Sequence, residues 1–147
     1  MNRDRLIAIT LFSSSAALVW ILFVTFLIDG GFFSLLNLTG VCSSIIAASV
    51  VSSLIAPRIY KIEQSKRTKQ FGALHGVGIT FLSFFLGSIL FFGSGFMVDG
   101  YSLNFKIIQE QISLALTGFL VATIFMSPGY LLGAFTGVIY VNYLNRK

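Results

Sequence analysis

The side chains of this chain that could do chemistry are few and scattered. There is one histidine, His75, and among the carboxylates Asp29 and Asp99 each precede a glycine. One histidine cannot complete a multi-ligand metal site. A Ser-His-Asp set is also excluded, because His75 and the two aspartates belong at opposite ends of the apolar segments that separate them. We therefore predict no enzyme, no metal site and no cofactor.

The two aspartates have two interpretations. Carboxylates brought to the same end of neighbouring segments can bind a cation. However, Asp-Gly is also a turn-forming pair, because glycine tolerates positive φ and aspartate bonds to nearby backbone. We favour the second interpretation and expect Asp29 and Asp99 to form outer turns, each joining two apolar segments.

The histidine and the single cysteine are expected to have ordinary structural roles. His75 lies near the start of an apolar segment, so we predict an interfacial, hydrogen-bonded histidine rather than a proton carrier. Cys42 lies within another apolar segment, and a free cysteine in such a setting behaves as a small buried hydrophobe. A reactive thiol is the less favoured alternative.

Composition defines the class of protein. Hydrophobic residues make up 56 % of the chain and charged residues only 10 %, against about 25 % charged in a typical soluble domain. So few charges cannot cover a surface that faces water. The sequence therefore predicts a single all-α domain over residues 1–147, a polytopic integral membrane protein.

Four membrane spans are predicted, at about 6–28, 35–56, 72–98 and 112–143, forming two antiparallel hairpins. Pro57 is expected to end the second. The uncharged stretch 112–145 holds 34 residues, or about 50 Å of straight helix, against a hydrocarbon core of about 30 Å. We expect one long span kinked at Pro128, with a re-entrant break or two short half-spans as the alternative.

The basic residues predict the orientation. Half of the ten lie in one hydrophilic loop, and the remainder lie near the two termini except for Lys106. The loop residues are Arg58, Lys61, Lys66, Arg67 and Lys69. Because lysine and arginine concentrate on the cytosolic side, we predict that this loop and both termini are cytosolic, in a bacterial inner membrane. The loop is expected to meet anionic lipid headgroups, or alternatively a protein partner. Nucleic acid is not expected.

Small residues recur at four-residue intervals in three of the predicted spans. Positions four apart lie on one helix face, and small residues there let helix backbones approach closely in lipid. We therefore predict helix-packing faces, whose partners are either internal helices or another subunit. The faces are Gly40, Ser44, Ala48, Ser52 and Ala56; Gly72 and Gly76; and Gly129, Gly133 and Gly137.

These patterns lead to three expectations for function. The first is a non-enzymatic accessory or assembly subunit of a larger membrane complex, acting through helix–helix packing with another membrane protein or with itself. The second is a homo-oligomeric channel or carrier for a small solute or ion, with polar contacts from Asn37, Thr39, Ser43 and Thr117. The third is an immunity or inhibitor protein against a membrane-active toxin, whose layout of four spans resembles this one.

Overall fold

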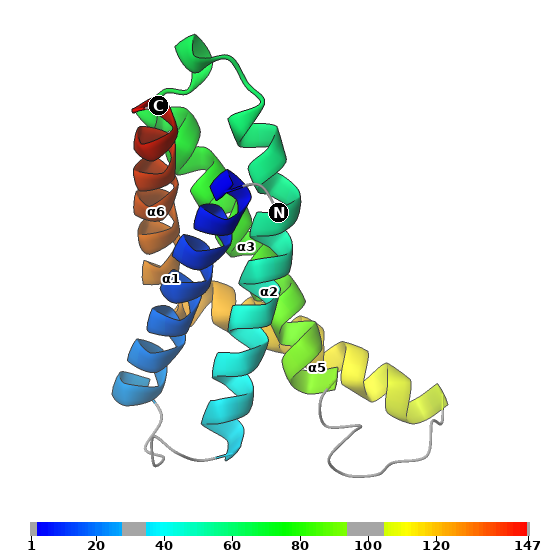
Figure 1. The fold of residues 1–147 in the computed structure, drawn as a ribbon. Helices are drawn as coiled ribbons and strands as arrows, with labels where there is room; N and C mark the ends of the chain where they lie inside the picture. Colours follow the sequence, from blue (N-terminus) through cyan, green and yellow to red (C-terminus); the bar gives the residue numbers. More distant parts are fainter. Residues whose placement is uncertain (1–2, 28–34, 94–104, 147) are drawn as a thin grey trace.

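The computed structural model describes residues 3–27, 35–93 and 105–146. Over these ranges the chain is helical and contains no strand, which confirms the all-α fold class. The helices are α1 (Arg3–Leu27), α2 (Leu35–Tyr60), α3 (Lys69–Gly93), α5 (Phe105–Phe125) and α6 (Pro128–Asn145), with a short 3-10 helix, η1 (Gln64–Lys66), before α3 (Figure 1). The predicted turns at Asp29 and Asp99 lie outside the described residues.

Four of the described helices are long and apolar enough to cross a membrane. They contain the stretches Arg3–Leu22, Leu38–Tyr60, Lys69–Gly93 and Lys106–Phe125. In hydrocarbon every backbone N–H and C=O must find a partner within the protein, and a helix provides these partners within one segment. The helices therefore indicate an integral membrane protein.

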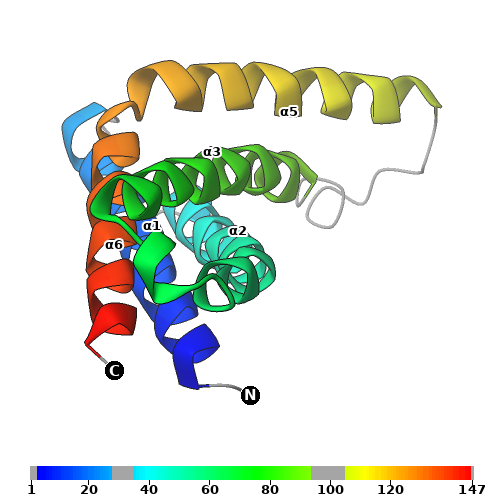
Figure 2. The same cartoon turned by 90° about the horizontal axis from the view of Figure 1, so that it is seen from above.

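Helices α1, α2, α3 and α6 form a bundle. Around it α1 packs on α2, α2 on α3, α3 on α6, and α6 on α1. Helix α5 packs on α3 outside this bundle, and its first half extends beyond the bundle in both views (Figures 1 and 2). Because α5 has no other extensive contact among the described helices, most of its surface is uncovered by this chain.

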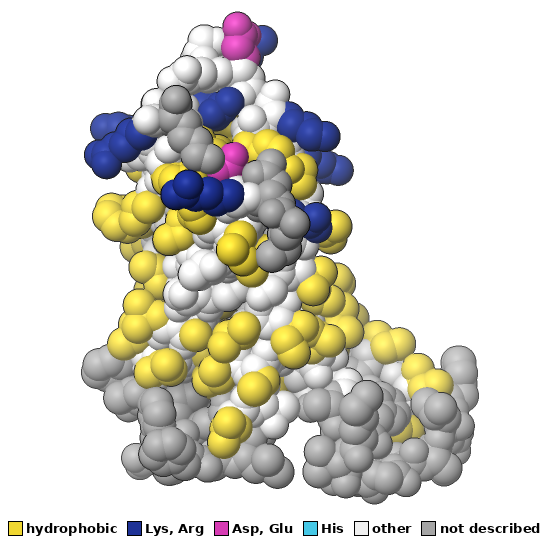
Figure 3. Space-filling view, in the orientation of Figure 1, with side chains coloured by type: hydrophobic (Ala, Val, Ile, Leu, Met, Phe, Trp, Pro, Cys, Tyr) yellow, Lys and Arg dark blue, Asp and Glu magenta, His cyan; other side chains and the backbone are white. Residues whose placement is uncertain are grey.

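The first and last helices and the basic loop meet at one end of the bundle. The start of α1, the end of α6 and η1 all lie there (Figure 1). In the space-filling view the lysine and arginine side chains gather around this end, while the sides of the bundle are mostly apolar (Figure 3). We call it the basic end.

The last apolar stretch is divided rather than bent. Helix α5 ends at Phe125 and α6 starts at Pro128, and the two helices point in clearly different directions (Figures 1 and 2). The Gly129 N–H donates to the Met126 carbonyl (2.7 Å), which starts the new helix. The break lies at Pro128, as the sequence predicts. Two separate helices are present there instead of the expected single kinked helix, because the backbone changes direction by more than the loss of one hydrogen bond requires.

Pro57 does not end α2, contrary to the expectation from sequence. The helix continues through Pro57 to Tyr60. The reason is the side chain of Ile59, which is only 1 % exposed and belongs to the buried core near the basic end. Burial of a large aliphatic side chain is worth roughly 1.5–3 kcal/mol, which offsets much of the cost of proline near the end of a helix.

Candidate intramembrane binding site

The predicted glycines of α3 and α6 face one another. A Cβ on Gly72 would lie 2.7 Å from the Gly137 carbonyl oxygen. A Cβ on Gly76 would overlap the carbonyl oxygen of Gly133 outright. Only glycine allows backbones to come this close, so these four positions set the distance between α3 and α6.

The remaining predicted small residues also lie against helices of this chain. Gly40 provides the space occupied by the Trp20 ring, and a Cβ on Gly129 would lie 2.9 Å from Phe84. Ala48, Ser52 and Ala56 are buried, while Ser44 is half-buried. Apart from Ser44, these small residues are therefore covered within the chain.

A partly open cavity of about 270 Å³ lies between the bundle and α5. It is in the half away from the basic end, since the basic half is filled by a core that includes Ile59, Tyr140 and Leu144. All five α-helices contribute to its wall. Most of the lining is aliphatic, aromatic or glycine, and the remainder consists of hydroxyls: Ser15, Ser43, Ser44, Thr80, Ser83 and Ser88.

Four of the hydroxyls are already bonded. Thr80, Ser83 and Ser43 donate to carbonyls of their own helices, at 3.0, 2.7 and 3.0 Å. Ser15 bonds to Leu11 O (2.9 Å) and meets the Thr136 hydroxyl of α6 at 2.7 Å. These bonds satisfy the hydroxyls in a low-dielectric interior.

Ser44 and Ser88 differ from the other four hydroxyls. Neither makes a hydrogen bond to any part of the chain that the structure describes. Ser88 is only 9 % exposed. A hydroxyl left unbonded away from water costs roughly 1–3 kcal/mol, so these two groups are available to a molecule in the cavity.

Aromatic rings close the far end of the cavity. Trp20 lies against Phe91, with ring centroids 5.6 Å apart, and Phe91 meets Phe92 edge-on at 5.2 Å. The Phe92 ring sits over Gly118 of α5, in the space that a Cβ at that position would take. Trp20 is the only tryptophan in the chain, and it therefore reports on this cavity alone.

Among the residues that the structure describes, no lysine, arginine, histidine, aspartate or glutamate lines the cavity. Within the described ranges there is likewise no group of three or more histidine, cysteine, aspartate or glutamate side chains that could hold a metal. A charged group would be strongly disfavoured in so apolar a space. The site is therefore suited to binding a neutral molecule.

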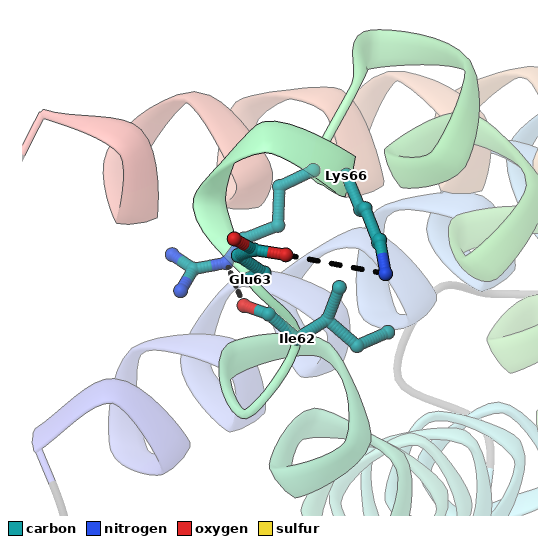
Figure 4. Close-up of polar contacts among 4 residues, drawn as sticks. Ile62, Glu63 and Lys66 are labelled. Atoms are coloured by element: carbon teal, nitrogen blue, oxygen red, sulfur yellow. Dashed lines mark hydrogen bonds and ion pairs between the residues drawn. The ribbon is translucent and has the colours of Figure 1, made fainter.

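The predicted basic loop contains one residue with a structural task. The Arg67 guanidinium donates to the carbonyl of Ile62 (2.7 Å; Figure 4) and to that of Tyr60 (3.3 Å), so it folds the loop back on the end of α2. Lys66 forms an exposed ion pair with Glu63 at 3.9 Å (Figure 4). The side chains of Arg58, Lys61 and Lys69 are exposed.

Hydrogen bonds join the two terminal helices and the loop at the basic end. The Tyr140 hydroxyl donates to the Asp4 carbonyl (3.1 Å), and the Tyr143 hydroxyl to the Asp4 carboxylate (3.2 Å). Asn145 donates to Arg67 O at 2.9 Å. These bonds hold the N-terminus, the loop and the C-terminus together.

The structure agrees with the prediction for the histidine and contradicts the one for the cysteine. His75 Nδ1 lies 2.9 Å from Phe71 O and its ring packs on Phe71, as expected for a hydrogen-bonded histidine. Cys42 is exposed on α2, so the prediction that it is buried in the protein is wrong. An apolar segment does not reveal which of its faces turns outward, because lipid accepts an apolar side chain as readily as the protein core does.

Sequence reasoning missed most of the cavity. Ser43 was among the expected polar contacts and does line it, whereas Thr117 is exposed on α5. The hydroxyls of α3 were overlooked within a phenylalanine-rich segment. Their spacing, Ser83 and Ser88 with Gly87 between them, was the available signal. A comparison with family models, curated proteins and solved structures finds no match to the chain.

Proposed function

We propose that this protein is a non-enzymatic accessory or assembly subunit of a larger membrane complex, and that α5 is the helix through which it binds its partner. The observation that carries this proposal is the position of α5. None of the residues in its apolar window is buried, and it packs extensively on α3 alone among the described helices.

The uncovered side of α5 carries a small-xxx-small step. Ser113 and Thr117 are four residues apart and both are exposed. They are flanked by Ile112, Leu116 and Leu120, which are 56, 50 and 60 % exposed. A step of small hydroxyl residues between large aliphatic ones lets a second helix approach closely and bond across the contact. Another exposed step of hydroxyl residues, Thr10 and Ser14, lies on α1, but that helix packs on both α2 and α6.

The test is native mass spectrometry of the protein released from its own membrane in mild detergent. We expect the wild-type chain to emerge with a partner protein or a second copy, and the double variant Ser113→Leu, Thr117→Leu to lose it. Thr10→Leu is the matched control, because Thr10 is an exposed hydroxyl residue on α1, away from α5.

A wild-type chain that emerges as a clean monomer would contradict the proposal. So would a complex that survives the double variant unchanged. A homo-oligomer of defined number, disrupted by the same variant, would identify the partner as a second copy of this chain.

The membrane surface supplies a second class of partner. The exposed basic residues Arg58, Lys61, Lys66 and Lys69 support contact with anionic lipid headgroups on the cytosolic side, at about 1 kcal/mol per residue near the surface. The same charges support an orientation with both termini cytosolic. The channel and the immunity functions stay predictions. A solute path through the bundle would have to open the tightly packed basic half.

A further inference from the structure

Three properties of the cavity together indicate which kind of ligand it fits. It lies in the apolar half of the molecule, away from the basic end. Its wall, over the described residues, is mostly apolar and carries no ionisable side chain. Its wall also contains two hydroxyls, Ser44 and Ser88, that make no hydrogen bond within the described chain.

The cavity is larger than a very small ligand needs. An apolar cavity of roughly 150 Å³ admits one benzene ring, and this one holds about 270 Å³. A molecule that fills it has an apolar body longer than a single ring. Along α3 the lining runs from Ile79 to Phe92, about four turns of helix, and an elongated chain fits this length better than a compact polycyclic body does.

We propose that the cavity binds a neutral, membrane-soluble molecule with one elongated acyl or isoprenoid chain and a single hydroxyl or carbonyl group, which Ser88 and Ser44 recognise by hydrogen bonding. The aromatic end formed by Trp20, Phe91 and Phe92 contacts the far part of the apolar chain. This inference is independent of the partner-binding role of α5.

The single tryptophan provides the assay. We would titrate purified protein in neutral detergent with a brominated long-chain fatty alcohol, and separately with a brominated isoprenoid alcohol, while following Trp20 fluorescence. Bromine quenches tryptophan at short range, so binding in the cavity gives quenching that saturates. Saturation with either alcohol supports the proposal, and the one that binds more tightly names the chain type.

Two glycines on α3 provide matched variants. Gly87 lines the cavity, and a Cβ there would meet only Ala47 Cβ, at the ordinary distance of 3.7 Å. Gly87→Leu therefore places an isobutyl group beside the cavity wall, and we expect it to abolish the saturable quenching. A Cβ on Gly78 would meet nothing within 4 Å, and Gly78 does not line the cavity, so Gly78→Leu should bind as the wild type does.

A second, smaller substitution tests the site in case Gly87→Leu fails to fold. Ser88→Ala removes only the hydroxyl, and we expect it to weaken binding of the alcohol about fivefold to tenfold. Ser53→Ala is its control, because Ser53 bonds to Val50 O and does not line the cavity. The ionised fatty acid of the same chain length should bind much more weakly than the alcohol.

Several outcomes would overturn the inference. Quenching that never saturates would mean that the probe meets Trp20 from the bulk detergent or that the cavity holds only water. Saturable quenching that Ser88→Ala and Gly87→Leu leave unchanged would place the ligand elsewhere. Equal affinity for the alcohol and the fatty-acid anion would refute a site for a neutral molecule.

Discussion

At the scale of single residues, the smallest side chains have the most definite roles. Gly72 and Gly76 of α3 face Gly133 and Gly137 of α6 so closely that a single methyl group would collide with backbone. Serine and threonine hydroxyls supplement these contacts, as between Ser13 and Ser49 (2.8 Å), which joins α1 to α2. In lipid, where burial gives little drive for helices to associate, such contacts hold a bundle together.

Gly76→Ala should destabilise the protein measurably. The added methyl overlaps the Gly133 carbonyl, and overpacking of this kind costs typically 1–3 kcal/mol. We expect a lower melting temperature in detergent, followed by size-exclusion chromatography or light scattering. Gly78→Ala is the control on the same helix, since its methyl meets nothing within 4 Å. Equal melting temperatures for the two variants would refute the close α3–α6 contact.

At the scale of elements, the length and burial of a helix depend on the helices that pack against it as well as on its own sequence. Helix α2 passes through Pro57 because Ile59 is anchored in the core. Helices α5 and α6 come from one uncharged stretch yet have opposite surroundings. The first leaves its apolar window unburied, while seven residues of the second are buried.

The loop between α2 and α3 is an element whose shape depends on one arginine. Arg67→Lys keeps the positive charge but loses the guanidinium contacts to Ile62 O and Tyr60 O. We expect unchanged membrane orientation but faster trypsin cleavage in the loop, since lysine preserves the cleavage site. Lys66→Arg should leave the rate unchanged, because the Lys66 side chain is exposed. Equal cleavage of both variants would mean that Arg67 does not hold the loop.

At the scale of the whole molecule, the chain has one charged, bonded end and one apolar half that contains a cavity. The basic end joins α1, the loop and α6 through Tyr140, Tyr143 and Asn145. This asymmetry matches the distribution of lysine and arginine along the sequence, and it places the cavity in the half of the bundle away from that end.

The orientation of this asymmetric molecule can be measured directly. In a Cys42→Ala background, Ser65→Cys places one thiol on the exposed loop. We expect a membrane-impermeant maleimide to label it only after the cells are permeabilised, because the positive-inside bias puts the loop in the cytosol. Labelling in intact cells would reverse the predicted orientation. A permeant maleimide applied to intact cells shows that the thiol is reactive.

The sequence alone was sufficient for the helical class, for the apolar stretches, for the position near Pro128 at which the last stretch breaks, and for the clustering of basic charge. These depend on hydropathy and charge along the chain, which are local properties. Only the tertiary structure decided that the small-residue faces are covered by this chain's own helices, that Cys42 faces outward, that α5 leaves the bundle and that Ser44 and Ser88 line a cavity. The physical reason is that a helix of nearly uniform hydropathy carries no record of which face meets protein and which meets lipid. That choice is made by close contacts between residues far apart in the sequence, such as Gly76 with Gly133.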